Sequence, residues 1–317
     1  MPAFLFPGQG SQEVGMASDL LAGDSFFLSL VETGSHCVGE DLKTLCLRGP
    51  EKRLRQSKFL QPLLVAVSLG YLRHLQDKGL IADLVLGHSL GEITALAAAG
   101  VVSPEQAVTM AAHRGRLMEE AAAAVADGGM MAVMGTQREA LKVLLEDGVS
   151  DEPVTLANDN APNQVVLSGT RTALEKMARL IAAGRIGSCR FLSVTGPWHS
   201  RHMEPARARF EKWSETLEFK KPRVPIVMNV SGQPEEDPVQ IKRNIIRAIA
   251  EPVQWRSAMA HVKAKGGADL IEIGPGRVLA GLARANGFGN ETRVLTVSSL
   301  RDVEAVWHAL VHAAVTP

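Results

Sequence analysis

The chain has 317 residues, of which 46% are hydrophobic and 21% charged, so it can bury a large core in one or two globular domains. Its 34 Lys and Arg residues balance its 34 Asp and Glu residues, which excludes a general binder of nucleic acid or membrane surfaces. The three cysteines provide neither a disulfide framework nor a paired zinc spacing, and this indicates the reducing cytoplasm.

The first residues contain a short apolar run, 3–6, that ends at Pro7-Gly8. No cationic stretch precedes this run, and we expect neither a signal peptide nor a membrane anchor there. No apolar run in the chain reaches the roughly 18 residues of a spanning helix. We therefore interpret residues 3–6 as a buried strand that is followed by a tight loop.

Strands and helices then alternate, which is typical of the βαβ units that build a mostly parallel sheet. A strand is predicted over 84–86, and the sharp turn Gly87-His88-Ser89-Leu90-Gly91 follows it. The helices predicted in this part of the chain cover residues 63–75, 92–99 and 104–123.

A different rhythm begins at Asp127-Gly128-Gly129, where the predicted order becomes β-α-β-β-α-β, the ferredoxin-like arrangement. The strands are 130–134, 154–157, 164–167 and 190–194, with an Asn/Pro loop between the middle two, and the helices are 138–145 and 172–183. We therefore predict a ferredoxin-like subdomain over residues 126–195, inserted into an α/β body of residues 1–125 and 196–317.

The body resumes after the subdomain. Strands are predicted over 224–229 and 270–273, with a helix over 239–249 between them. Gly274-Pro275-Gly276 then turns into a helix that runs through Ala283, and the acidic stretch 233–238 is predicted as a surface loop.

The turn around Ser89 is the sharpest functional motif. It lies between a strand and a helix, the context of a nucleophile elbow, in which glycines let the backbone turn and the serine hydroxyl projects. The helix N-terminus behind it supplies N–H donors and a positive dipole for an oxyanion. The alternative is a plain strand-to-helix turn in which Ser89 caps the helix.

A serine nucleophile needs a base. His199 stands in Gly196-Pro197-Trp198-His199-Ser200, where a predicted strand ends in a loop. His202 lies three residues after His199, and the two could bind a metal together. No third ligand has an informative spacing, so we expect no metal. If His199 is the base, acylation should slow as the pH falls through the ordinary histidine pKa of about 6.5.

The loop Gly8-Gln9-Gly10-Ser11-Gln12 lacks the third glycine of a dinucleotide fingerprint, because Glu13 stands in its place. It is either a tight turn or the donor of a second oxyanion N–H.

Several motifs occur in one order along nearly the whole chain. They are Phe6 to Gln12, Gln61-Pro62, Gly87 to Glu92, Arg114-Gly115, Asn160 to Val166, Gly196 to Ser200 and Gly274-Pro275-Gly276. Each is modest alone, but together they resemble the malonyl-CoA:acyl carrier protein transacylases, which include the fatty-acid synthesis enzyme and the stand-alone acyltransferases of polyketide synthases.

The resemblance implies an α/β-hydrolase-like body and a serine–histidine transferase. Ser89 matches the nucleophile and His199 the general base. The backbone N–H groups of Gln9 and Leu90 match the oxyanion hole. Gln254 matches the place whose backbone carbonyl orients the histidine.

The resemblance also implies substrate contacts. Arg114 matches the arginine that binds the malonyl carboxylate, and a guanidinium can hold a carboxylate through two parallel hydrogen bonds. On spacing alone, Arg114 would be a surface residue. Asn160 matches a position near the cleft. Members selective for malonyl often have Phe before the histidine and methylmalonyl-selective ones Ser, so the larger Trp198 predicts a preference for malonyl.

The function that the resemblance implies is transfer of a malonyl group from malonyl-CoA to the phosphopantetheine thiol of an acyl carrier protein through a malonyl-serine. We expect a cytoplasmic monomer without a cofactor, with no nucleic-acid or membrane partner. The alternatives are an acyl hydrolase of carrier-protein thioesters, the malonyl transferase of malonate decarboxylase, and a non-enzymatic carrier-binding scaffold.

Carrier proteins are typically acidic, so a local basic patch should meet them. The candidates for this patch are Lys176, Arg179, Arg185, Arg190 and Arg201. The alternative is a solvated charged face.

Overall fold

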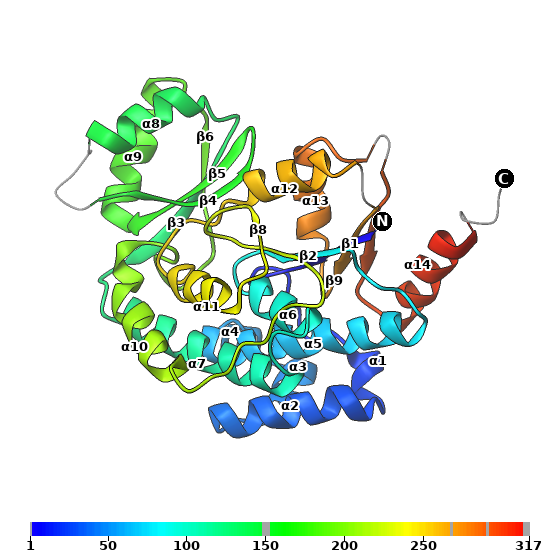
Figure 1. The fold of residues 1–317 in the computed structure, drawn as a ribbon. Coiled ribbons are helices and arrows are strands. Elements are labelled where there is room, and N and C mark those ends of the chain that lie inside the picture. The colour runs from blue at the N-terminus through cyan, green and yellow to red at the C-terminus, as the bar shows by residue number, and fades with distance from the viewer. Residues whose placement is uncertain (1, 148–152, 267–268, 290–291, 313–317) are drawn as a thin grey trace.

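A computed structural model describes residues 2–147, 153–266, 269–289 and 292–312. The body is built on a six-stranded sheet of order β10-β9-β1-β2-β7-β8, in which only β8 pairs antiparallel. Its strands are β1 (Pro2–Phe6), β2 (Leu84–Gly87), β7 (Ile226–Val227), β8 (Pro234–Glu235), β9 (Asp269–Ile273) and β10 (Val294–Val297). The parallel pairing confirms the predicted α/β fold class (Figure 1).

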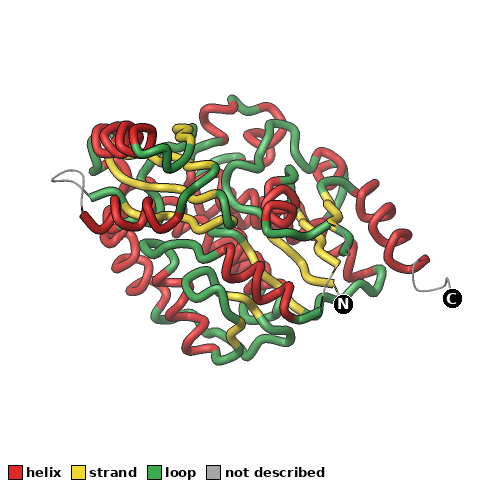
Figure 2. Tube along the Cα trace, turned by 90° about the horizontal axis from the view of Figure 1, so that it is seen from above, coloured by secondary structure: helices red, strands yellow, loops and turns green. Residues whose placement is uncertain are grey.

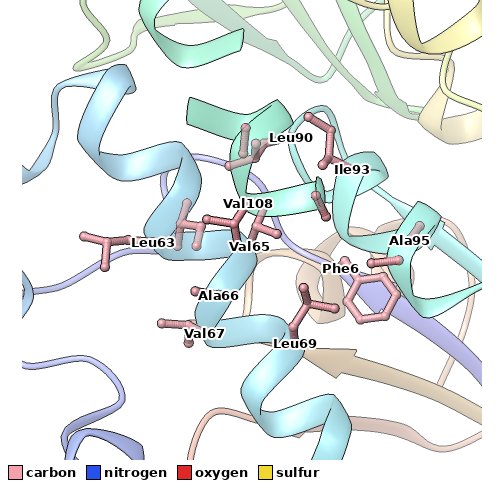
Figure 3. Close-up of a cluster of buried hydrophobic side chains, with 14 of the residues drawn as sticks. Phe6, Leu63, Val65, Ala66, Val67, Leu69, Leu90, Ile93, Ala95 and Val108 are labelled. Carbon is pink, nitrogen blue, oxygen red and sulfur yellow. The ribbon is translucent and has the colours of Figure 1, made fainter. Parts of the chain in front are cut away.

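Helices cover both faces of this sheet, because alternate side chains of each strand point to opposite faces. In β1, Phe4 and Phe6 enter one core, whereas Ala3 and Leu5 enter the other. The first core is shared with α2 (Ser25–Val38), α5 (Ser57–Asp77), α6 (Gly91–Ala98) and α7 (Pro104–Ala123), and Figure 3 shows Phe6 among side chains of these last three helices. The second core is shared with α12 (Trp255–Ala264) and α13 (Val278–Ala285).

The other helices of the body complete its outer layers. They are α1 (Ser18–Leu21), α3 (Leu42–Arg48), α4 (Glu51–Leu54), η1 (Arg201–Met203), α10 (Glu204–Ser214), α11 (Pro238–Arg247) and α14 (Leu300–His312). No helix in the described ranges combines the length and the apolar character that a bilayer crossing requires.

A separate antiparallel sheet of order β4-β5-β3-β6 forms the small subdomain. Its elements are β3 (Gly128–Met134), α8 (Arg138–Asp147), β4 (Thr155–Ala161), β5 (Gln164–Thr170), α9 (Arg171–Ala183) and β6 (Ser188–Phe191). This order is ferredoxin-like, as predicted, and Figures 1 and 2 show the small sheet at one side of the body with α8 and α9 on its outer side. The subdomain limits at 126 and 195 remain a prediction.

Two loop predictions are corrected by strand pairing. β4 runs on to Ala161, so the predicted Asn/Pro loop shrinks to Pro162 and Asn163. The stretch 233–238 contains β8, which pairs with β7. β4 extends because its end also bonds the body: the Asp159 N–H donates to the Val253 carbonyl at 2.9 Å. This bond joins the small sheet to the body close to the predicted site.

Candidate active site

Ser89 lies in the predicted turn at the carboxyl end of β2. Its φ of 53° is in the left-handed region, which is strained for a residue with a side chain. A Cβ at Gly87 would lie 1.9 Å from the Gly91 backbone, and one at Gly91 would lie 1.9 Å from the Phe6 carbonyl oxygen. Only glycine fits at these two positions, so the sequence allows the tight elbow that presents the Ser89 hydroxyl.

The structure brings His199 to Ser89, 110 residues away in sequence, with Oγ and Nε2 2.7 Å apart. His199 Nδ1 donates to the carbonyls of Ala248 and Glu251 at 2.9 and 3.2 Å. Because Nδ1 carries the proton, Nε2 is the acceptor that faces the serine hydroxyl. His199 is 3% exposed, and its φ of 56° is also left-handed. The pair has the geometry of a nucleophile and its base.

The assignment of Gln254 as the residue that orients the histidine is wrong. Its carbonyl accepts the N–H of Ala258 at 3.0 Å, because Gln254 is the N-cap of α12. The carbonyls that reach His199 belong instead to the short segment that follows α11. The histidine is therefore oriented by backbone carbonyls, but from a different turn.

Arg114 is 4% exposed and lies beneath the nucleophile. Its Nη2 donates to Ser89 Oγ at 3.2 Å and its Nη1 to Gln61 Oε1 at 2.9 Å. The interpretation of Arg114 as a surface residue is therefore wrong. A buried guanidinium at this place can receive the charged end of an acyl group carried on Ser89.

The side chain of Gln9 belongs to the same network. Gln61 Nε2 donates to Gln9 Oε1 at 3.0 Å, and Gln9 Nε2 donates to Ser57 Oγ at 3.1 Å. Hydrogen bonds thus run from the N-terminal loop through α5 to Arg114 and Ser89. In the sequence, Gln61 stands out only as part of the motif Gln61-Pro62, and Ser57 belongs to none of the predicted motifs.

The backbone around Ser89 offers donors for an oxyanion. Among the described residues, no hydrogen bond occupies the backbone N–H of Gln9 or of Leu90. Leu90 starts the turn into α6, and Gln9 lines the cleft beside Ser89. The oxyanion role of these two N–H groups stays a prediction.

Asn160 lies at the end of β4, and its Oδ1 is 2.8 Å from Nε2 of His88, the residue before the nucleophile. Its carbonyl accepts from Asn286 Nδ2 at 2.9 Å. Asn160 lines the cleft, so its predicted position near the site agrees with the structure. It holds the small sheet against the elbow.

Burial controls the charges at this site. It lowers the pKa of His199 to about 3, and the positive charge of Arg114 and the neighbouring His88 add to this shift. The expectation of an ordinary histidine pKa is therefore wrong, and His199 is neutral at physiological pH. Burial also lowers the pKa of Arg114 to about 10 and raises that of Glu92 to about 7.

A cleft of about 490 Å³ opens above Ser89 between the two sheets. Met130, Ala132 and Val166 of the small sheet line it, with Trp198 beside His199. Trp198 is buried, and its ring packs so closely on Gly196 that a Cβ there would lie 2.7 Å from it. The indole is thus held inward, where it narrows the cleft.

The predicted basic residues do not form one patch. Arg190 of β6 pairs with Ala132 of β3, and both line the cleft. Lys176 and Arg179 lie on α9, which packs on the opposite face of the small sheet. Neither Arg185 nor Arg201 lines the cleft. Arg55, which the sequence analysis missed, lines it and is half-exposed.

Asn229 was not among the predicted site residues, and Glu92 entered only as the end of the motif Gly87 to Glu92. Both side chains are buried, and Asn229 Oδ1 accepts the N–H of Ser89 at 2.8 Å. Asn229 lies two residues beyond β7 of the parallel sheet, and a position just past the carboxyl end of such a strand is a signal for a site residue. Within the described ranges, no three His, Cys, Asp or Glu side chains gather as metal ligands would, so His199 and His202 find no third ligand there.

Comparison with known proteins finds relatives that match nearly the whole chain. The family model for the acyl transferase domain matches residues 3–297. The chain is 36% identical over 285 residues to the polyketide biosynthesis malonyl CoA-acyl carrier protein transacylase PksC of Bacillus subtilis, covering 89% of this chain and 96% of that protein. It is also 36% identical over 284 residues to the malonyl CoA-acyl carrier protein transacylase of Bacillus subtilis, covering 89% of each.

Solved structures match over almost all of the chain. An acyl carrier protein S-malonyltransferase from Vibrio cholerae is 36% identical with a TM-score of 0.90, over 96% of this chain and 99% of that one. A malonyl-transacylase in complex with its type II PKS acyl-carrier protein is 32% identical with a TM-score of 0.90, over 97% of this chain and 99% of that one.

Proposed function

The chain belongs to the malonyl-CoA:acyl carrier protein transacylase family, and from this premise we propose that Ser89 is its nucleophile, His199 its general base and Arg114 its carboxylate anchor. It is an acyltransferase that moves a malonyl group from malonyl-CoA to an acyl carrier protein. The observation that carries the proposed roles is the 2.7 Å contact between Ser89 Oγ and His199 Nε2.

The first half-reaction acylates the serine. His199 Nε2 accepts the Ser89 proton while Oγ attacks the thioester carbon of malonyl-CoA. The carbonyl oxygen becomes an oxyanion, which the N–H groups of Gln9 and Leu90 stabilise. The C–S bond then breaks, and the CoA sulfur leaves with the proton from His199. The products are malonyl-Ser89 and CoA.

The second half-reaction runs through the same atoms in reverse. His199 accepts the proton of the phosphopantetheine thiol, and the sulfur attacks the ester carbon of malonyl-Ser89. When the C–O bond breaks, Ser89 Oγ takes back the proton from His199. The neutral imidazole is needed at the start of each half, and its burial keeps it neutral.

Arg114 gives the site its preference for a charged acyl group. Its guanidinium lies 3.2 Å from Ser89 Oγ, so it is within reach of an acyl group on that oxygen. A carboxylate that leaves water for this buried place needs a partner, and a two-pronged cation is the best one. A hydrolase of neutral acyl chains would gain nothing from a buried cation here.

For the carrier protein, we propose Arg190 and Arg55 as the first contacts. They are the cations that line the cleft, whereas Lys176 and Arg179 lie on the far face of the small sheet. An acidic carrier would be steered to the cleft by such charges.

We also propose a cytoplasmic location, because Cys37, Cys46 and Cys189 are all free.

The test is the intact mass of the protein after mixing with malonyl-CoA. The wild-type enzyme should gain the mass of one malonyl group. When holo carrier protein is added, the enzyme should lose this mass and the carrier protein should gain it. Ser89→Ala should gain nothing while keeping its fold, since a single hydroxyl contributes little stability. An adduct mapped to another residue would refute the role of Ser89, and rapid loss of the malonyl group to water would favour a hydrolase.

A further inference from the structure

The side chain of Asn229, which is 4% exposed, binds the nucleophile elbow at two points. Its Oδ1 accepts the Ser89 N–H at 2.8 Å, and its Nδ2 donates to the Gly87 carbonyl at 2.7 Å. These bonds span 140 and 142 residues of sequence, and they join the segment just after β7 to the carboxyl end of β2 and the turn that follows it. One amide group therefore holds the backbone on both sides of His88.

Asn229 is itself held from two sides. Its N–H donates to Oε1 of Glu92 at 2.7 Å, and its carbonyl accepts the N–H of Gln254 at 2.7 Å. Glu92 lies in the first turn of α6 and is only 1% exposed. The amide thus sits in a fixed place between the elbow helix and the segment that leads into α12.

The elbow needs such a restraint. A non-glycine residue at a φ of 53° is strained, and strain of this kind persists only where the surroundings fix the backbone. Gly87 and Gly91 permit the turn without enforcing it. The bond from the Ser89 N–H holds the peptide group that borders the strained φ, and the bond to the Gly87 carbonyl holds the peptide group before it.

We propose that Asn229, held in place by Glu92, is a positioning residue that keeps Ser89 in its reactive conformation. The proposal rests on the proposed role of Ser89 as nucleophile. It also explains how the donors are divided: Asn229 occupies the N–H of Ser89, so the next N–H, that of Leu90, is the one left for the oxyanion.

Asn229→Asp tests the proposal because it keeps the shape of the side chain. When ionised, one oxygen still accepts the Ser89 N–H, but the other faces the Gly87 carbonyl and repels it. When protonated, the O–H can donate to that carbonyl as the amide did. Burial raises the pKa of a carboxyl group, so this protonation should occur in an accessible pH range.

The measurement is the rate constant of Ser89 acylation by malonyl-CoA in single-turnover rapid quench. We expect Asn229→Asp to be roughly 10- to 100-fold slower than wild type at pH 8, as for a buried hydrogen bond replaced by repulsion. The deficit should shrink as the pH falls to 6, and wild type should show no such recovery. The titratable and charged groups around the elbow are Glu92, Arg114, His88 and His199. The pKa of Glu92 is about 7, so the wild-type profile over the same pH range measures what Glu92 itself contributes.

Binding is measured separately. Malonyl-CoA should bind equally to Ser89→Ala and to Ser89→Ala/Asn229→Asp, because positioning of the hydroxyl does not affect ground-state affinity. Asn244→Asp is the matched control, a buried asparagine of α11 changed in the same way, and it should show no pH-dependent deficit. Glu92→Gln, which keeps an acceptor for the Asn229 N–H, should retain more acylation than Glu92→Ala.

Two results would overturn the proposal: acylation by folded Asn229→Asp that equals wild type at every pH, or a deficit that lies entirely in malonyl-CoA binding. If wild type formed no malonyl adduct, the proposed function would fail instead. A fluorophosphonate that phosphonylates reactive serines, with release of fluoride, would then compare Ser89 labelling in the two proteins. Equal labelling rates would refute the positioning role, and slower, pH-recoverable labelling in Asn229→Asp would support it.

Discussion

The floor of the cleft belongs to the body and most of its roof to the small sheet, and the two differ in how their side chains are held. The floor consists of Ser89 and His199, with Arg114 buried next to Ser89, and each of these side chains is fixed by hydrogen bonds to a partner distant in sequence. The roof consists of Met130, Ala132 and Val166 of the small sheet, with Trp198 at the edge, and it is held by packing. The floor supplies directed polar groups, whereas the roof supplies shape.

This difference separates two kinds of selectivity. A charged acyl end is recognised by a directed donor pair on the floor, whose loss leaves a buried charge unpaired. A branched acyl group is excluded because the roof leaves little space above Ser89. One extra methyl group in an apolar pocket changes the selectivity only modestly. Substitutions in the floor should therefore change activity more than substitutions in the roof. Substitutions of the exposed cation Arg190 at the mouth of the cleft should change it least.

The largest effect should follow Arg114→Ala. Removing one partner of a buried ion pair typically costs about 3–5 kcal/mol, which is roughly 10² to 5 × 10³ in kcat/KM for malonyl-CoA. Acetyl-CoA has no carboxylate to lose, so the preference for malonyl over acetyl should narrow or invert. The measurement is kcat/KM for both thioesters.

Arg114→Lys is the control for the shape of the cation. It should recover only part of the malonyl activity, because an ammonium group lacks the two-pronged donor geometry. Equal losses on both thioesters would mean that Arg114 supports the elbow through its bond to Ser89 and does not select the acyl group.

His199→Ala should lower acylation by roughly 10² or more, since it removes the base. The pH profile sharpens this prediction. A histidine of ordinary pKa would lose roughly tenfold between pH 7.5 and 5.5. Burial and the charge of Arg114 lower the pKa of His199 to about 3, so kcat/KM of wild type should change less than twofold over that range. Protonation of Glu92 in this range leaves the Arg114 charge less compensated, which keeps His199 neutral.

Stability gives an independent check of the same pKa shift. In the unfolded chain, His199 binds a proton near pH 6.5, whereas in the folded protein it does so only near 3. Between these values the unfolded state binds more protons, so His199 makes the free energy of unfolding fall as the pH falls from 6.5. Denaturant unfolding should show a weaker decline for His199→Gln than for wild type. Identical slopes for the two proteins would contradict the lowered pKa.

Trp198→Ala should have a smaller effect, confined to the roof. It should raise the use of methylmalonyl-CoA relative to malonyl-CoA by about tenfold, the scale of one methyl group in an apolar pocket. Competition between the two thioesters, followed by the mass of the acyl-enzyme, measures this ratio directly. A ratio unchanged from wild type would show that the branched substrate is excluded elsewhere.

Much of this arrangement could be predicted from local sequence. The elbow, the alternating strands and helices of the body and the ferredoxin-like order of the subdomain all follow from motifs and hydrophobic periodicity that span a few residues. Local motifs made Ser89 and His199 candidates for nucleophile and base, but their pairing and the role of Arg114 came from the resemblance, because spacing alone could not bring residues 110 positions apart into contact. Local spacing even favoured a surface position for Arg114.

The errors share one physical cause, which is that each depends on contacts that form only when distant segments pack together. The carbonyls of Ala248 and Glu251 were missed, and Gln254 was chosen instead, because a backbone carbonyl carries no side-chain signature. The pKa of His199 was misjudged because burial depends on the whole fold. Asn229 had a signal, its place at a strand end, but its bonds to the elbow appear only when β7 pairs with β2.

The smallest effect should come from Arg190, which lines the cleft, and Arg179 of the same subdomain is its matched control. Arg190 faces the cleft beside Ala132, whereas Arg179 lies on α9 behind the sheet. An exposed ion pair contributes about 0.2–1 kcal/mol, so Arg190→Ala should raise KM for the carrier protein by at most about fivefold. The loss should diminish at high salt, because exposed charges are screened. Arg179→Ala should leave this KM unchanged, and an equal loss in both variants would move carrier docking to the outer face of the small sheet.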